Sequence, residues 1–389
     1  MDSKSLNSRV TAQRFSVIRD MVARAKAYDD VISLSIGEPD FDTPAFVCEA
    51  AMRDAMKGAT HYAPSHGDED LRAALLQEIR RKTGIPYADE NLLITTGAMH
   101  GLLAVMLTIL SAGDEVICPA PCFSDYQGHC GLAGATLVMV PTKFSEGFIP
   151  SREDLQACLT PRTKALLINS PCNPSGIVLP PETLDMMAEF AIEHDLIVIS
   201  DEVYDRIVFS APIESIATRP GMSDRTVILN SFSKAYAMTG WRVGFAAGPA
   251  WIMREMIKVL SYSIASTNSP GQRAAFHAMT GPQDEFLAFV DAYRRRTALA
   301  YRRLIAMPGV RCIKPAGTFY LFPHIEAAEN DSFAFAVDLL DKEHIVVVPG
   351  FPFGPEQTVR GCIRLACTVS EEKIAEAMDR LEHYLTRRS

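Results

Sequence analysis

A lysine flanked by hydroxyl side chains is the most reactive feature of this sequence. Ser231, Ser233 and Lys234 follow an apolar run, and Arg242 lies a little further along the chain. A lysine just beyond a strand can reach a ligand at the strand ends, where open α/β sheets bind their ligands. Burial and nearby cations would lower the pKa of its amine, as imine formation with an aldehyde requires. A lone lysine is more often a surface cation, so the assignment depends on its neighbours.

These neighbours suit a dianionic phosphate. Ser231 and Ser233 offer two hydroxyl groups, and Arg242 offers a fixed cation. A second phosphate-binding element is the stretch Gly97, Ala98 and Met99, where an apolar segment ends and a helical pattern begins. Backbone N–H groups at a helix start bind phosphate without a charged side chain, although such a turn needs glycine on steric grounds anyway. The sequence predicts a phosphate site built from both elements.

An acidic residue follows another apolar run. Asp201 and Tyr204 come directly after residues 196–199, which read as a strand buried on both faces. A carboxylate there needs a partner, and a protonated pyridine nitrogen would serve, because the ion pair keeps such a ring able to absorb electrons. The alternative is an aspartate that caps the next turn.

Three further side chains suit an aromatic cofactor. Asn173 and Tyr204 could hydrogen-bond a phenolic oxygen, and Phe123 could stack on a ring face. Each has an ordinary alternative: the loop around Asn173 is rich in turn-forming residues, and a lone aromatic residue is more often part of the core.

Taken in order, these segments resemble the class I and II aminotransferases, which are fold-type I pyridoxal-phosphate (PLP) enzymes, over nearly the whole chain. The resemblance implies that Lys234 holds PLP as a Schiff base, that Asp201 pairs with the pyridine nitrogen, and that Asn173 and Tyr204 bind the phenolic oxygen. Lys234, Asp201 and Tyr204 are thereby the expected catalytic residues. The remaining expected cofactor contacts are Gly97, Ala98, Met99, Phe123, Ser231, Ser233 and Arg242.

The same resemblance extends to the substrate and to a second subunit. Gly37, in Gly-Glu-Pro-Asp, resembles the loop over the active site, and Arg364 resembles the arginine that binds the substrate α-carboxylate. Asn173 is also expected to bind the substrate. An arginine on an apolar strand is costly to bury without a carboxylate opposite, which independently favours a ligand role over an exposed position on an edge strand. Tyr62 resembles the tyrosine that reaches the neighbouring subunit's phosphate, so a homodimer is expected.

The elements that must position these residues form an α/β fold. From about residue 92, short apolar runs alternate with helical patterns, which predicts a mainly parallel seven-stranded sheet flanked by helices. The expected strands are Leu92–Thr96, Glu115–Cys118, Thr136–Val140, Ala165–Asn169, Ile197–Ser200, Val227–Leu229 and Val243–Ala246.

Beyond a long helical pattern at 282–306, the chain predicts a smaller α+β domain, with a helix near 333–342 and strands at 345–348 and 362–366. We assign residues 41–284 to a large PLP-binding domain, and residues 1–40 with 285–389 to the small domain.

The composition of the chain limits the partners, metal sites and cellular compartment that can be expected. The 389 residues carry a net charge of −9 without a basic stripe, which argues against a nucleic-acid partner. The nine cysteines show no Cys-x-x-Cys spacing, so we expect reduced thiols and no metal site. The polar opening, Met1 to Lys4, lacks the apolar run of a secretory signal, and no stretch is long and apolar enough for a membrane span. A cytoplasmic protein is expected.

The expected reaction moves the amino group of an L-amino acid to a 2-oxo acid by a ping-pong mechanism. Two alternatives stay open: a PLP-dependent β- or γ-lyase of the same fold, and a non-catalytic PLP-binding regulatory module. The motifs do not name the amino acid. Met99 and His100 follow the Gly97 turn, where a cation would serve a second substrate carboxylate, and this departure argues against aspartate specificity.

Overall fold

A computed structural model describes residues 6–13, 15–209 and 213–387. Met1 to Lys4, on which the expectation of no secretory signal depends, lie outside the described residues. Within the described ranges, none of the helices combines the length and the apolar character needed to cross a membrane.

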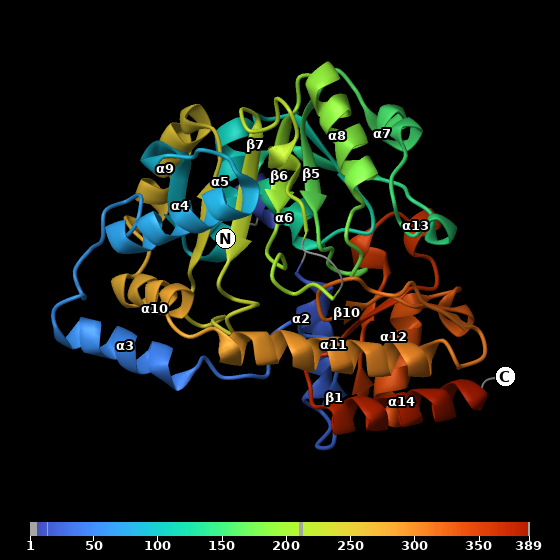
Figure 1. Ribbon diagram of the computed structural model, residues 1–389. Coiled ribbons are helices and arrows are strands. Elements are labelled where there is room, and N and C mark those ends of the chain that lie inside the picture. The colour runs from blue at the N-terminus through green and yellow to red at the C-terminus, as the bar shows by residue number, and fades with distance from the viewer. Residues whose placement is uncertain (1–5, 14, 210–212, 388–389) are drawn as a thin grey trace.

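A seven-stranded sheet lies at the centre of the larger part of the molecule (Figure 1). All its strands run parallel except β8, which pairs antiparallel with both of its neighbours. The predicted α/β class, with its mainly parallel sheet, is confirmed, and each predicted strand is present within a few residues. In spatial order the strands are β2 (Leu92–Thr95), β8 (Gly244–Ala247), β7 (Thr226–Ser231), β6 (Ile197–Asp201), β5 (Thr163–Asn169), β3 (Glu115–Pro119) and β4 (Thr136–Val140).

Helices cover both faces of this sheet, because alternate strand residues point to opposite sides. On β7, Val227 and Leu229 pack into one hydrophobic cluster, whereas Ile228 packs into another. The first cluster is completed by α5 (Gly97–Ile109), α6 (Asp125–Ala133) and α9 (Ala250–Ile264). The opposite face is covered by α4 (Glu69–Thr83), α8 (Pro181–Glu193) and α10 (Ser269–Thr280), with α3 (Ala45–Met56) packed against α10.

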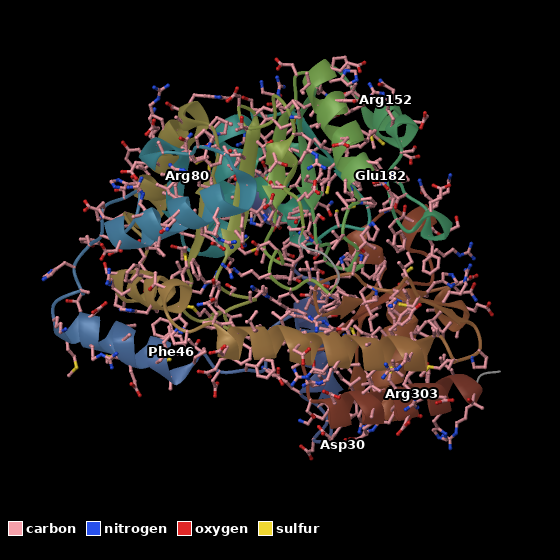
Figure 2. The ribbon with its side chains drawn as sticks, viewed as in Figure 1. Asp30, Phe46, Arg80, Arg152, Glu182 and Arg303 are labelled. Atoms are coloured by element: carbon pink, nitrogen blue, oxygen red, sulfur yellow. The ribbon has the colours of Figure 1, made fainter. Side chains whose placement is uncertain are left out.

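The C-terminal part forms a separate α+β layer with the N-terminal segment. Its central helix α11 (Asp284–Leu304) packs against α14 (Glu371–Thr386), and Arg303 of α11, labelled in Figure 2, forms ion pairs with Asp379 and Glu382. Figure 1 shows α2 (Val17–Ala25) and β1 (Ile32–Ser33), in dark blue, among these orange and red elements. The early residues pack there because β1 pairs with β12 (Ile345–Val346) and because Met21 and Leu34 enter the C-terminal core.

Two details of the smaller part differ from the sequence prediction. The expected strand at 345–348 is two short strands, β12 and β13 (Val348–Pro349), which join different sheets. In the other sheet β14 (Ile363–Ala366) lies between β13 and β10 (Tyr320–Leu321). Arg364 is therefore on a central strand and only 1 % exposed, so the alternative of an exposed arginine on an edge strand is wrong.

In the smaller part, α12 (Ser332–Glu343) packs against α14 and places Phe335 and Leu339 in the C-terminal core. The remaining elements are short. They are α1 (Ser8–Thr11), α7 (Arg152–Cys158), α13 (Glu356–Val359), β9 (Val310–Arg311) and β11 (His324–Ile325). The assignment of residues 41–284 to one domain, and of 1–40 with 285–389 to another, stays a prediction. One hydrophobic cluster contains residues of the smaller part alone, whereas another joins the two parts, since Leu71 and Phe286 both belong to it.

Candidate active site

A cavity of about 520 Å³ opens where the carboxyl ends of the central strands meet the C-terminal part of the chain. The predicted site residues meet at this cavity because parallel strands end at the same edge of a sheet. Twelve of the fourteen predicted site residues line it. These are Gly37, Ala98, Met99, Phe123, Asn173, Asp201, Tyr204, Ser231, Ser233, Lys234, Arg242 and Arg364.

The amine of Lys234 lies inside this cavity. Lys234 Nζ donates a hydrogen bond to the carbonyl oxygen of Gly37, 2.6 Å away. Burial lowers the pKa of Lys234 to about 8, and the positive charges of Arg364 and Arg242 act in the same direction, while Glu38 opposes them. A substantial fraction of this lysine is therefore neutral, and nucleophilic, near physiological pH.

Asp201 stands at the end of β6 and is 5 % exposed. Its Oδ2 accepts a hydrogen bond from the hydroxyl of Tyr126 at 2.5 Å, and its Oδ1 accepts one from the N–H of Val203 at 3.3 Å. Burial raises the pKa of Asp201 to about 6, against these hydrogen bonds and the charge of Lys234. The turn-capping contact that was the alternative for this residue is thus present, but it uses Oδ1 alone, and Asp201 also lines the cavity.

The predicted phosphate-binding groups form a compact cradle. Ser231 Oγ donates to Ser233 Oγ at 2.8 Å, and α5 begins at Gly97 with no side chain capping its first N–H groups. Gly97 itself does not line the cavity, but it borders it: a Cβ at this position would lie 2.6 Å from Arg242 Nη2. Two hydroxyls, one guanidinium and an uncapped helix N-terminus are the donors that a phosphate dianion needs.

Arg364 is a buried cation without a counter-ion in the part of the chain that the structure describes. Its Nη1 donates to Asn173 Oδ1 at 2.9 Å and its Nη2 to the carbonyl of Ser35 at 2.6 Å, whereas its buried Nε has no partner. The guanidinium lies between two aromatic rings, 4.6 Å from the centre of Tyr320 and 5.1 Å from that of Phe353. A buried, oriented and uncompensated cation of this kind is suited to bind a carboxylate.

Two residues that contact predicted site residues were not identified from the sequence: Tyr320, which lines the cavity, and Tyr126, which is buried and does not line it. Tyr126 bonds Asp201, and Tyr320 accepts a hydrogen bond from the Tyr204 hydroxyl at 3.2 Å. Tyr126 lies in the first turn of α6, three residues after Phe123, and the two rings pack edge to face with centroids 5.5 Å apart. No sequence signal marks Tyr320, which reaches the site through the pairing of β10 with β14.

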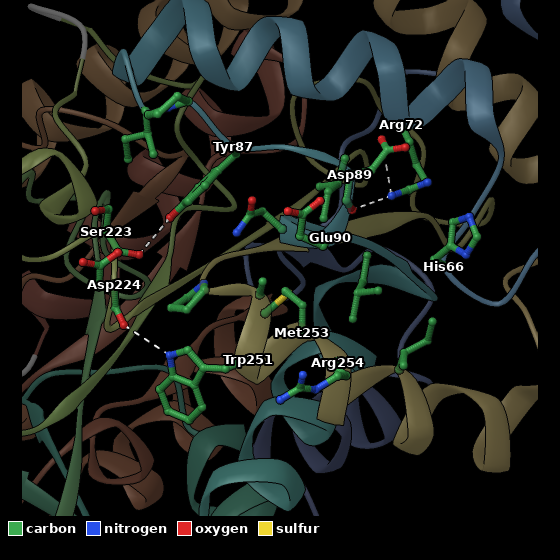
Figure 3. A pocket seen from close by; sticks show the side chains of 18 residues that line it. His66, Arg72, Tyr87, Asp89, Glu90, Ser223, Asp224, Trp251, Met253 and Arg254 are labelled. Atoms are coloured by element: carbon green, nitrogen blue, oxygen red, sulfur yellow. Dashed lines mark hydrogen bonds and ion pairs between the residues drawn. The ribbon is translucent and has the colours of Figure 1, made fainter.

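Tyr62 lies apart from this cavity and is 88 % exposed. A second, larger cavity of about 1150 Å³ lies at another surface, between α4, α9 and the loop that precedes β2 (Figure 3). It is lined by His66, Arg72 and Trp251 among others, and it contains none of the predicted site residues.

The chain matches the family model of class I and II aminotransferases over residues 29–381. It belongs to that family. It is 39 % identical over 386 residues to an aspartate aminotransferase of Pyrococcus abyssi, with 98 % of each chain covered. It is also 39 % identical to the arginine–pyruvate transaminase of Pseudomonas aeruginosa, covering 92 % of this chain and 91 % of that one.

Solved structures agree with these sequence matches. The aspartate aminotransferase of Thermus thermophilus with maleate superimposes with a TM-score of 0.91 at 37 % identity, covering 97 % of this chain and 99 % of the other. The predictions of family, fold and PLP-dependent amino transfer are therefore confirmed. The cavity fits PLP because three groups line it together: the Lys234 amine, whose pKa is lowered to about 8, the buried carboxylate of Asp201, and the predicted phosphate-binding residues.

Proposed function

We propose that this aminotransferase moves the amino group of an L-amino acid to a 2-oxo acid in a ping-pong reaction, with Lys234 as the central amine. The observation that carries this assignment is that the amine of Lys234 and the uncompensated guanidinium of Arg364 line one cavity. One group can exchange amines and protons, and the other can bind an α-carboxylate.

The cofactor contacts follow from the cradle. Ser231, Ser233, Arg242 and the N–H groups of Ala98 and Met99 would hold the phosphate of PLP, beside Gly97. Asp201 would pair with the ring nitrogen, Phe123 would lie against the ring, and Asn173 and Tyr204 would bind the phenolic oxygen. When bound, PLP supplies an electron-withdrawing ring that stabilises negative charge on the substrate α-carbon.

Each protein group then has one task. Arg364 binds the α-carboxylate, and Asn173, already bonded to Arg364 at 2.9 Å, fixes the position of that guanidinium. Lys234, with a pKa of about 8, takes the α-proton from the substrate and later returns a proton as the amine exchange completes. The Gly37 carbonyl accepts an N–H of Lys234, so this contact orients the amine and leaves the lone pair of its neutral form free to react.

The two alternatives are not favoured. The relatives at 38–39 % identity are named as transaminases or aminotransferases, rather than as lyases or regulators. A lyase is distinguished from a transaminase by its product, because it releases ammonia instead of passing the amino group to a 2-oxo acid.

We propose further that the enzyme is a homodimer and that it works in the cytoplasm. Tyr62 projects from the surface rather than into its own cavity, as a residue supplied to a neighbouring subunit should. The nine cysteines are free thiols, which suits a reducing compartment.

The role of Lys234 is tested by borohydride reduction of the PLP-loaded protein followed by peptide mapping. We expect label on residue 234 alone, and none in Lys234→Ala, which should fold normally and lose at least about a thousandfold in turnover. Lys258→Ala, at an exposed lysine on α9, is the matched control. Label on another lysine, or near-normal turnover in Lys234→Ala, would contradict the assignment.

The role of Tyr62 is tested by mixing subunits of Lys234→Ala with subunits of Tyr62→Ala at limiting PLP. If Tyr62 serves the neighbouring subunit, one of the two sites in each hybrid dimer contains both native residues. In a 1:1 mixture about half of the dimers are hybrids, so activity rises towards about a quarter of the native value. If Tyr62 serves its own site, no site is intact and the hybrid stays as inactive as the parents.

A further inference from the structure

The substrate side of the active-site cavity contains a carboxylate that the proposed reaction does not use. Asp125 is half-buried at the start of α6 and lines the cavity together with Phe123 and Arg364. Its carboxylate has one side-chain partner, the hydroxyl of Ser124 at 3.2 Å. Among the described residues, no lysine, arginine or histidine lies within ion-pair distance of it.

A purely structural role for Asp125 is the simpler explanation to be weighed. An acidic side chain in the first turn of a helix is stabilised by the helix dipole, and Ser124 provides no side-chain cap there. That role requires only a position on the helix end. It does not require that the carboxylate face a ligand cavity and lack a cationic partner.

The location of Asp125 relative to Arg364 places it near the substrate. The two residues line the same cavity, and the negative charge of Asp125 acts on the pKa of Arg364, which burial otherwise lowers. Since Arg364 is proposed to bind the α-carboxylate, a bound amino acid would occupy the cavity that Asp125 also lines.

The other lining groups do not supply a buried cation for an acidic side chain. Met99 occupies the helix start next to the phosphate cradle, and Ile18, Val22 and Ile36 are apolar. Arg19 of α2 and Lys26, which follows α2, also line the cavity, but both side chains are exposed. The half-buried charge that is not already assigned to the cofactor or the α-carboxylate is therefore negative.

We propose that Asp125 selects the amino donor by the charge of its side chain, favouring cationic amino acids such as arginine and ornithine over aspartate and glutamate. This inference rests on the proposed aminotransferase function. Overall similarity does not decide the matter, because relatives named for aspartate and for arginine are both 39 % identical to this chain. A guanidinium or ammonium group would gain a charge-assisted hydrogen bond from Asp125, whereas a second carboxylate would be repelled.

The test compares arginine, its neutral isostere citrulline, and glutamate as donors to the PLP-loaded enzyme in single-turnover half-reactions. We expect native kcat/KM to be highest for arginine. Asp125→Asn should lower the value for arginine by about 10- to 100-fold, the effect of losing one charge-assisted contact, change that for citrulline by less than about threefold, and raise that for glutamate. Asp284→Asn, an exposed first-turn aspartate of α11, is the matched control and should change none of them.

A second readout does not depend on turnover. In a Lys234→Ala background, arginine should raise the melting temperature of the PLP-loaded protein more than citrulline does, and Asp125→Asn should remove that difference. The inference is overturned if Asp125→Asn weakens all three donors equally, as loss of a structural cap would, or if native enzyme prefers glutamate to arginine. If no amino acid reacts with native enzyme, the proposed function fails; if citrulline reacts as well as arginine, only the role of Asp125 fails.

Discussion

The hydroxyl of Tyr126 donates a 2.5 Å hydrogen bond to Oδ2 of Asp201, at the buried end of β6. The bond stabilises the ionised form of a carboxylate whose pKa burial raises to about 6. Tyr126 thus keeps Asp201 available as an anion, although Tyr126 stands outside the catalytic motifs.

Replacing Tyr126 by Phe should therefore weaken PLP binding in a pH-dependent way. Loss of the donor raises the pKa of Asp201 further, so that more of this carboxyl is protonated at mildly acidic pH. We expect about a tenfold weaker affinity for PLP near pH 6 and a smaller effect near pH 8. Fluorescence titration of apoprotein with PLP at the two pH values measures this, and an equal loss at both would contradict it.

The same buried carboxylate should cost stability in the cofactor-free protein. The pKa of Asp201 in the fold, about 6, exceeds its ordinary value of 3.8, so protonation favours folding. The stability contributed by Asp201 is complete below about pH 4 and is lost as pH rises through about 6.

Asp201→Asn apoprotein should accordingly exceed native apoprotein in unfolding free energy above about pH 7, by at most roughly 3 kcal/mol, while being catalytically impaired. Denaturant unfolding at pH 4.5 and pH 8 measures the difference. Part of the native pH dependence should persist in the variant, because burial also raises the pKa of Glu202 to about 7. If Asp201→Asn apoprotein is less stable than native apoprotein at pH 8, the prediction is wrong, and other groups in the fold must stabilise the ionised carboxylate.

The rate at which PLP attaches covalently to the apoprotein should depend on the fraction of Lys234 that is neutral. Only the neutral amine attacks an aldehyde, and the pKa of Lys234 is lowered to about 8. The rate of covalent attachment to apoprotein should increase with pH and level off above about pH 8. Stopped-flow absorbance measures the rate, and a rise that continues towards pH 10 would indicate a lysine of ordinary pKa.

Arg364→Leu should separate substrate binding from stability. The buried guanidinium lacks a counter-ion, so an apolar replacement should leave the melting temperature unchanged or raise it. It should also raise KM for amino acids by about a hundredfold or more, since the α-carboxylate loses its partner. Unchanged KM, measured in half-reactions with several amino acids, would remove the proposed role.

Much of the central sheet could be predicted because its strands are buried on both faces and read as apolar runs. The site motifs could be located for a related reason: they directly follow those runs, at the strand ends. The short strands β12 and β13 were merged because Ile345–Val348 is continuously apolar, and only the different partners of the two halves separate them.

Contacts between distant segments could not be predicted in this way. The hydrogen bond between Tyr204 and Tyr320, and the position of α2 over the cavity, depend on how the terminal parts pack against the large sheet. Sequence spacing carries no information on that packing, so the residues of α2 and β10 were missed while the motif residues were found.

The close approach of Gly37 to Tyr320 has a consequence for sequence variation. A Cβ on residue 37 would lie 1.6 Å from the Tyr320 hydroxyl, so no other amino acid fits while the tyrosine keeps its place beside Arg364 and Tyr204. The two positions should therefore co-vary among homologues: a side chain at position 37 should appear only where position 320 has become small.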